Sequence, residues 1–139
     1  MATPAAVASA VETKVLANTS ATAALANLLS KDESLAAGDT KMRRPTVAVG
    51  MFRDSNHNFV IASIDIEMVH MLSDPTDEDT YLNGDALTDQ AVLMDSEFFR
   101  TVTGVIEIID EPELTKPTRE LPGNVIEYTV TVQVAISNA

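Results

Sequence analysis

The closing stretch NVIEYTVTVQVAIS, residues 124 to 137, limits the fold of this chain more than any other part of the sequence. Apolar side chains alternate there with polar ones. One set faces one way (Ile126, Tyr128, Val130, Val132, Val134, Ile136) and the other set faces the opposite way (Glu127, Thr129, Thr131, Gln133). This period of two, in residues of high β-propensity, predicts a long antiparallel strand with one buried face. The domain is therefore expected to contain a sheet with one buried face and one solvent-exposed face.

Three further segments are predicted to join this sheet. IASIDIEMVH, residues 61 to 70, shows the same alternation, with Ala62, Ile64, Ile66 and Met68 opposite Ser63, Asp65 and Glu67. PTVAVGMF begins at Pro45, and a proline at a strand start costs no ladder hydrogen bond. VIEIID, residues 105 to 110, is the remaining strand. EPELTKPTRELPG, residues 111 to 123, is predicted to be a loop, because its three prolines exclude a central strand.

The N-terminal segment is predicted to be helical over residues 4 to 17. Thr3 is a suitable cap and Pro4 suits the first helical position, while Val7, Val11 and Val15 recur on one face. Asn18 to Ser20 then offer a stop and a new cap, and Leu25, Leu28 and Leu29 predict a second short helix or a bent extension of the first. Residues 31 to 44 are polar and are expected to form a loop that leads into the sheet.

A third helix is predicted over residues 85 to 102. Its expected apolar stripe consists of Leu87, Ala91, Met94, Phe98 and Val102, and Asp85 and Asp89 lie in the favoured N-terminal region of its dipole. The element order α(α)ββαββ predicts an α+β domain with helices on one face of a mostly antiparallel four-stranded sheet. At 139 residues, the chain is expected to form a single domain over residues 1 to 139.

The net charge of -12 is unevenly distributed along the chain. Residues 1 to 44 contain five basic and four acidic residues, a net charge of +1, whereas residues 45 to 139 contain four basic and seventeen acidic residues, a net charge of -13. Such a charge repels phosphates, so binding to nucleic acid or anionic lipid through a basic surface is not expected. The alternative is that the charge only keeps the protein soluble.

The sequence contains no Cys, and we expect no targeting signal in it. The lack of Cys excludes disulfides, thiolate catalysis, iron–sulfur clusters and the common structural zinc sites. The alanine-rich N-terminus lacks a basic start and has Glu12 and Lys14 where a signal peptide has its apolar run. No apolar run approaches the roughly 18 residues of a membrane span, so we expect a soluble protein.

Two segments resemble metal-binding loops without meeting the requirements of one. Asp54, Asn56 and Asn58 have the spacing that opens a calcium loop, but Phe59 occupies the sixth position, where glycine is needed. A hairpin turn is the better interpretation. The acidic stretch SDPTDEDTYLNGD, residues 73 to 85, fails the same test, which leaves an adventitious divalent ion on Asp77, Glu78 and Asp79 as an alternative.

Catalytic patterns are equally weak. His57 lies in the expected turn, and His70 extends the buried side of its strand as a satisfied histidine at the edge of the core. The five glycines are scattered singly and form no phosphate loop. We therefore assign no catalytic, cofactor-binding or metal-binding residue and expect no enzyme. The acidic stretch and the proline-rich residues 112 to 123 are candidate partner contacts, with solvated loops as the alternative.

The whole pattern resembles the tail-completion or tail-terminator proteins of long-tailed double-stranded DNA bacteriophages. The resemblance lies in the order and length of five segments: VASAVETKVLANTSATAALANLLS, RRPTVAVG, IASIDIEMVH, ALTDQAVLMDSEFFRTV and EYTVTVQVAIS. It implies a non-enzymatic virion protein that forms a hexameric ring, caps the tail tube and joins it to the neck. The implied partners are further copies of the chain, the tail tube protein and the neck or connector proteins, with assembly in the host cytoplasm.

The resemblance also implies that the genome passes through the ring lumen without sequence-specific binding, and that no membrane is involved. A head-to-tail ring brings two different surfaces of the chain together, so opposite charges are candidates for that contact. The residues predicted to contact a subunit or partner are Arg43, Arg44, Arg53, Asp77, Glu78, Asp79, Arg100, Lys116 and Arg119. The acidic members alternatively line the lumen and repel DNA, and the basic ones are alternatively ordinary solvated side chains.

Other functions fit the same sequence. A subunit of a phage-like secretion or contractile apparatus has the same physical requirements as a tail terminator. A neck, head-closure or capsid-decoration protein would bind a shell or portal in place of a tube end. A small-molecule-binding or enzymatic α+β domain would need a pocket with convergent polar groups, and the sequence shows only scattered ones.

Overall fold

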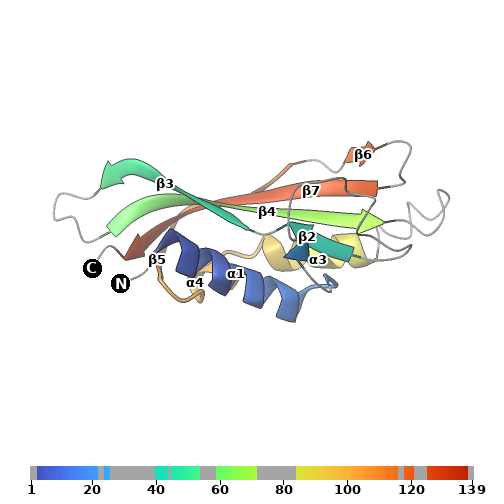
Figure 1. Ribbon diagram of the computed structural model, residues 1–139, viewed down its shortest axis with the longest axis horizontal. Helices are drawn as coiled ribbons and strands as arrows, with labels where there is room; N and C mark the ends of the chain where they lie inside the picture. The colour runs from blue at the N-terminus through green and yellow to red at the C-terminus, as the bar shows by residue number, and fades with distance from the viewer. Residues whose placement is uncertain are drawn as a thin grey trace.

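The computed structural model describes residues 3–21, 24–25, 40–43, 45–53, 59–71, 84–115, 118–120 and 125–137 (Figure 1). Within these residues the chain is an α+β domain with a mostly antiparallel sheet, as the sequence predicts, and the helices lie on one side of that sheet. The elements are α1 (Pro4–Asn18), β1 (Ala24–Leu25), β2 (Thr40–Arg43), β3 (Thr46–Arg53), β4 (Phe59–Met71), α3 (Asp85–Leu93), α4 (Ser96–Arg100), β5 (Val105–Leu114), β6 (Thr118–Glu120) and β7 (Val125–Ser137).

The centre of the sheet is the antiparallel pair β4 and β7. The two strands are 13 residues long and pair along their full length, from Phe59 opposite Ser137 to Met71 opposite Val125. β2 and β3 share the outer side of β4, and β5 and β6 share the outer side of β7. The four predicted strands therefore form the body of the sheet, and the three short strands β1, β2 and β6 extend it.

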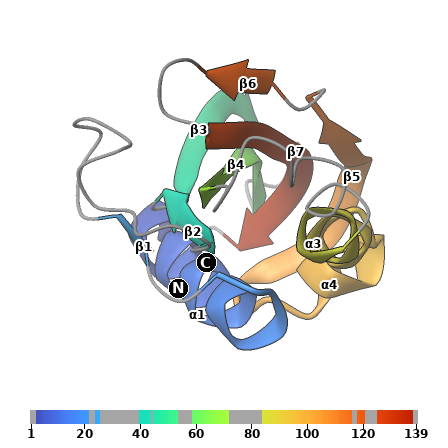
Figure 2. The ribbon, with the colours of Figure 1, turned by 90° about the vertical axis from the view of Figure 1, so that its right-hand side faces the viewer.

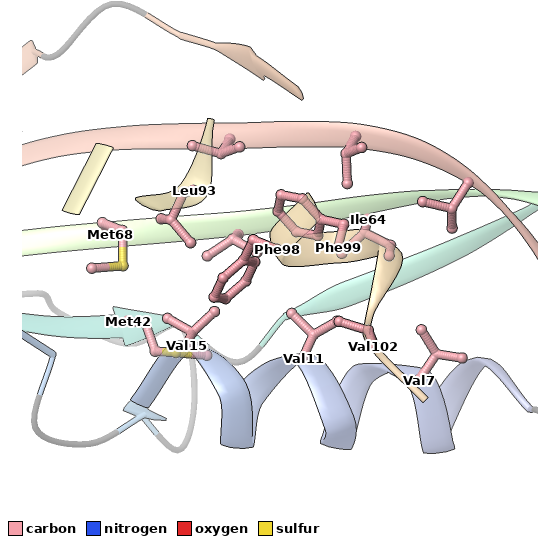
Figure 3. Packing of buried hydrophobic residues seen from close by; sticks show 14 of the residues in the cluster. Val7, Val11, Val15, Met42, Ile64, Met68, Leu93, Phe98, Phe99 and Val102 are labelled. Atoms are coloured by element: carbon pink, nitrogen blue, oxygen red, sulfur yellow. The ribbon is translucent and has the colours of Figure 1, made fainter. Parts of the chain in front are cut away.

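The hydrophobic core lies between the sheet and the helices (Figure 3). The predicted alternation is confirmed, because Ile64 of β4 and Val132 of β7 are buried while their sequence neighbours are partly exposed. Val7, Val11 and Val15 of α1 point into this core. A fully buried aliphatic side chain contributes roughly 1.5 to 3 kcal/mol, so these residues hold α1 on the sheet. Seen end-on, the strands curve over the core and the helices close it from below (Figure 2).

The N-terminal helix begins and ends as the sequence predicts. The Thr3 side chain accepts a hydrogen bond from the Ala6 N–H at 3.1 Å, and Pro4 occupies the first turn. The predicted second helix is wrong at residues 24 and 25, because Ala24 and Leu25 form β1 and pair in parallel with Met42 and Arg43. Pairing with β2 overrides the helix preference of alanine and leucine, because tertiary contacts can outweigh intrinsic propensity. Residues 26 to 39, which contain the rest of that prediction, lie outside the described chain.

The predicted helix over residues 85 to 102 is two helices. α3 ends at Leu93, and Asp95 caps α4 by accepting a hydrogen bond from the Glu97 N–H at 3.0 Å. The predicted apolar stripe is therefore wrong in its first half, since Leu87, Ala91 and Met94 are exposed. The side chains that α3 buries are Ala86, Asp89 and Leu93, and after the break Phe98, Phe99 and Val102 are buried. A new cap restarts the helical phase, which a continuous 3.6-residue period does not anticipate.

Two segments that we expected to be loops contain strands. Residues 40 to 43 form β2, and the proline-rich segment contributes the end of β5 and all of β6. Pro112 is accommodated because β5 is an edge strand whose register shifts between Asp110 and Glu113. None of the helices in the described residues is long and apolar enough to span a membrane.

Candidate functional site: the outer edges and the acidic face of the sheet

The predicted contact residues are scattered over the described structure. Arg43 ends β2 and Arg53 ends β3, both on the β4 side of the sheet, whereas Arg119 lies in β6 on the β7 side. Arg100 ends α4 and forms an exposed ion pair with Glu97 at 3.1 Å, a kind of contact that stabilises little. The other predicted contact residues lie outside the described chain: Arg44, Asp77, Glu78, Asp79 and Lys116. Their assignment stays a prediction.

The face of the sheet opposite the helices is acidic. In antiparallel strands, directly opposed residues lie on the same face, so the pairing places acidic residues of three strands together. They are Asp65 and Glu67 of β4, Glu127 of β7, and Glu107, Asp110 and Glu113 of β5. The Thr131 hydroxyl donates to Asp65 at 2.7 Å across the central pair. Lys41 of β2, opposite Val69, adds a basic group to this face. The sequence predicted a polar face but not its acidic extension onto β5.

The edge strand β5 does not pair regularly with β7. Its register shifts between Val105 and Glu107 and between Ile108 and Asp110, so Ile106 and Ile109 are extra residues without an opposed partner in β7. Such bulges turn side chains out of the ladder, and Ile106 and Ile109 are 52% and 39% exposed. The sequence indicates this irregular pairing. The apolar pairs Val105–Ile106 and Ile108–Ile109 recur every three residues, whereas the side chains of a regular strand alternate with a period of two.

The other outer edge is β3, and its chemistry is different. Residues 46 to 49 pair regularly with β4, and the sequence from Thr46 to Phe52 has no charged residue. Val49 is 43% exposed. Next to this strand, α1 and Pro45 form a shallow groove of about 520 Å³, lined by Ala5, Ala8, Ser9, Glu12, Thr13 and Pro45. This edge therefore offers backbone groups, small side chains and the Glu12 carboxylate.

Lys14 has a structural role that the sequence did not predict. Its Nζ donates to the Phe98 carbonyl oxygen and the Thr101 hydroxyl, and it lies 4.7 Å from the centroid of the Phe98 ring. These contacts link α1 to the end of α4, across more than eighty residues of sequence. A second groove of about 480 Å³ runs along this junction and includes Thr103 and Val102.

A cluster of buried polar side chains lies between the sheet and α3. His70 Nδ1 is 3.1 Å from the Thr40 hydroxyl, and the His70 ring stacks on the Tyr128 ring with centroids 5.3 Å apart. Asp89 accepts hydrogen bonds from the Ser20 N–H at 2.9 Å and from the Ser20 hydroxyl. Thr40, His70, Asp89 and Tyr128 are at most 3% exposed, so none of them faces solvent where a substrate could approach. His70 is thus a buried histidine with polar contacts, as the sequence predicted.

The pKa of the buried Tyr128 hydroxyl lies well above its ordinary value. Burial strongly raises the pKa of its hydroxyl, and the nearby Asp89 carboxylate raises that pKa further. Both causes act because ionisation would place a negative charge in the core beside another carboxylate. Among the described residues the hydroxyl has no hydrogen-bond partner to offset this.

Alkaline pH is expected to destabilise the protein through Tyr128. Below about pH 10 the phenol is neutral in both the folded and the unfolded chain. Above that pH the unfolded chain loses the proton first, so the free energy of unfolding falls by up to about 1.4 kcal/mol per pH unit for this group. Tyr128→Phe should remove this part of the decrease and change stability little at neutral pH. Urea unfolding of both proteins between about pH 9 and 11 would measure it, and equal slopes would contradict the assignment.

No group of three or more histidine or acidic side chains that could hold a metal ion occurs in the described part of the chain. No model of a protein family matches the chain, and no curated protein is detectably similar to it.

Proposed function

We propose that this chain is a structural protein of a long-tailed double-stranded DNA bacteriophage, with no enzymatic role. In this proposal it is a tail terminator or tail-completion protein that forms a ring, caps the tail tube and joins it to the neck. The fold has the α+β class that the element order predicted, with long central strands and helices on one side of the sheet. The partners of the chain are other copies of itself, the tube protein and the neck proteins.

The observation that carries the proposal is the acidic sheet face. Three neighbouring strands, β4, β7 and β5, contribute carboxylates to this face. The polar side chains of His70 and Tyr128, by contrast, are buried and closed to solvent. A protein that surrounds a passing genome needs a surface that repels phosphate, and negative charge provides it at long range. The face that carries Asp65, Glu67 and Glu127 is the surface that we place toward the lumen.

Assembly on tail tubes tests the proposed function directly. The purified protein is mixed with tubes that lack a cap, and the ends are examined by negative-stain electron microscopy, with native mass spectrometry of the free protein over a concentration series. We expect one closed ring at one end of each tube and an arrest of tube growth. Protein that leaves tube ends uncapped but binds capsids or portals would instead indicate a decoration or neck protein.

The charge of the sheet face can be tested in the same particles. Glu67→Gln with Glu127→Gln removes two carboxylates from the face, and Glu97→Gln with Glu12→Gln removes two from the helical side as a control. Capping should survive in both variants, whereas DNA delivery should slow only in the first, because DNA adheres more readily to a less negative lumen. Equal delivery by the two variants would contradict a lumenal position of this face.

A further inference from the structure

The outer side of β3 is an open edge of the sheet. In the described part of the chain β3 pairs only with β4, so its second side has no strand partner there. Thr46, Ala48, Val49 and Gly50 are exposed. The backbone N–H and C=O groups along such an edge need partners, so another strand can add to it. Figure 2 shows β3 above α1 and away from β5.

This edge lacks the features that usually keep other strands away. Charged side chains, prolines and bulges are the common protection of a sheet edge. The sequence from Thr46 to Phe52 has no charged residue and no proline, and β3 pairs residue by residue with β4 from Thr46 to Val49, with the first irregularity after Val49. β5, by contrast, has four carboxylates, Pro112 and three shifts of register. β3 is therefore the open edge and β5 the protected one.

The pairing with β4 shows which way the side chains of β3 point. Val47 and Val49 are opposite buried residues of β4, so they lie on the helical side of the sheet, and Thr46 and Ala48 lie on the outer face. Val49 is 43% exposed although it lies on the helical side. An additional strand beside β3 would cover it.

The helical side also has room for the side chains of an added strand. α1 packs against β3, and the groove of about 520 Å³ between α1 and Pro45 is lined mainly by small side chains. Valines of a second strand that point to the helical side would lie over this groove. Strand edge and groove therefore form one continuous docking surface.

We infer that two copies of the chain pair through β3, edge to edge and antiparallel, about a two-fold axis. The two strands continue one sheet across both copies. Val47 and Val49 of the two copies meet on the helical side, over the grooves beside α1, and Thr46 and Ala48 meet on the outer face. The contact buries the exposed Val49 of each copy and gives the open backbone groups partners.

The charges at the groove favour β3 as the partner strand. Glu12 places a carboxylate in the groove. β5 of a second copy would bring four further carboxylates against it, which is repulsive, whereas β3 brings no charge between Thr46 and Phe52. β1 and β6 are only two and three residues long. Among the strands of the described chain, β3 is the edge that fits β3.

This contact does not depend on the proposed function. A head-to-tail ring joins two different surfaces of the chain, whereas the β3 contact uses the same surface twice. The regular part of the edge is short, so we expect a reversible dimer whose population rises with protein concentration.

Opposite charges placed on the edge test the contact. Ala48→Lys and Ala48→Glu each place like charges close together in a two-fold pair, so each variant alone should raise the dissociation constant of the dimer by about tenfold or more. In an equimolar mixture the opposite charges attract, and heterodimers should exceed the share that random pairing gives. One variant is labelled with a heavy nitrogen isotope, so that native mass spectrometry separates heterodimers from homodimers.

Ala91→Lys and Ala91→Glu are the matched controls. Ala91 is exposed like Ala48 but lies on α3, away from the sheet edge. Both controls should dimerise like the unmodified chain and pair at random when mixed. Circular dichroism verifies that all four variants are folded.

Amide hydrogen exchange locates the contact on the chain. Exchange in residues 46 to 49 should slow as the concentration of the unmodified protein rises, because their outward N–H groups gain acceptors, and exchange in β5 should not change. An unmodified chain that stays monomeric at every concentration, or edge variants that pair at random, would overturn the contact. Tube capping that persists in that case would leave the proposed function standing.

Discussion

Replacing Leu93 by alanine is expected to lower the free energy of unfolding by about 2 to 5 kcal/mol. Leu93 ends α3 and is 0% exposed, so the substitution removes a side chain that is fully packed in the core and leaves a cavity. A domain of this size has only about 5 to 15 kcal/mol of stability, so the loss is a large part of the total. Urea unfolding followed by circular dichroism measures it, with an unchanged denaturant slope as evidence that the folded state is retained.

Leu87→Ala is the matched control for this prediction. It makes the same change in the same helix, but Leu87 is 51% exposed, so the effect should stay within about 0.5 kcal/mol. The continuous helix expected from the sequence placed Leu87 in the buried stripe, whereas the structure buries Leu93. A larger loss for Leu87→Ala than for Leu93→Ala would therefore contradict the observed break between α3 and α4.

Removing the Asp89 carboxylate is the second large change. Asp89→Ala should cost about 2 to 4 kcal/mol, because it deprives the Ser20 N–H and hydroxyl of a charged acceptor inside the protein. Asp89→Asn keeps the shape and one acceptor oxygen and should cost less. Since the Asp89 charge helps to raise the pKa of Tyr128, both variants should lower that pKa. Urea unfolding and the ultraviolet absorbance of tyrosinate during alkaline titration measure the two effects.

Asp95→Ala is the control for this pair of aspartates. Asp95 is exposed and caps α4 through the Glu97 N–H, so its loss should cost only about 1 kcal/mol and leave the Tyr128 titration unchanged. Equal losses for Asp89→Ala and Asp95→Ala would show that the link between Ser20 and Asp89 does not stabilise the fold. An unaltered Tyr128 titration in Asp89→Asn would show that the two groups are not electrostatically coupled.

The functional surfaces were only partly predictable. Charge counting predicted that acidic residues dominate residues 45 to 139, and the acidic sheet face of β4, β7 and β5 lies within them. The acidic contact surface was placed in the stretch from residue 73 to 85, which lies outside the described residues. β5 adds an acidic surface that the sequence did not predict, because its bulges and edge position bring Glu107, Asp110 and the protruding Ile106 together on one outer strand.

The sequence by itself determined the elements whose signal is local. The alternation in β4 and β7 repeats over 13 residues, so a change of register would move every apolar side chain to the wrong face. The cap at Thr3, the proline at the first turn and the valine spacing of α1 act within a few residues. These patterns were sufficient to predict the α+β class, the central strands and the side of the sheet that is buried.

Only the tertiary structure decided the features that depend on distant partners. Asp89 is buried because Ser20, 69 residues away, supplies two hydrogen bonds, and His70 is buried beside Thr40, 30 residues away. Ala24 and Leu25 are a strand because β2 lies beside them, and the bulges of β5 exist only relative to β7. Local patterns carry no information about these partners, because each contact forms only when the folded sheet brings the two segments together.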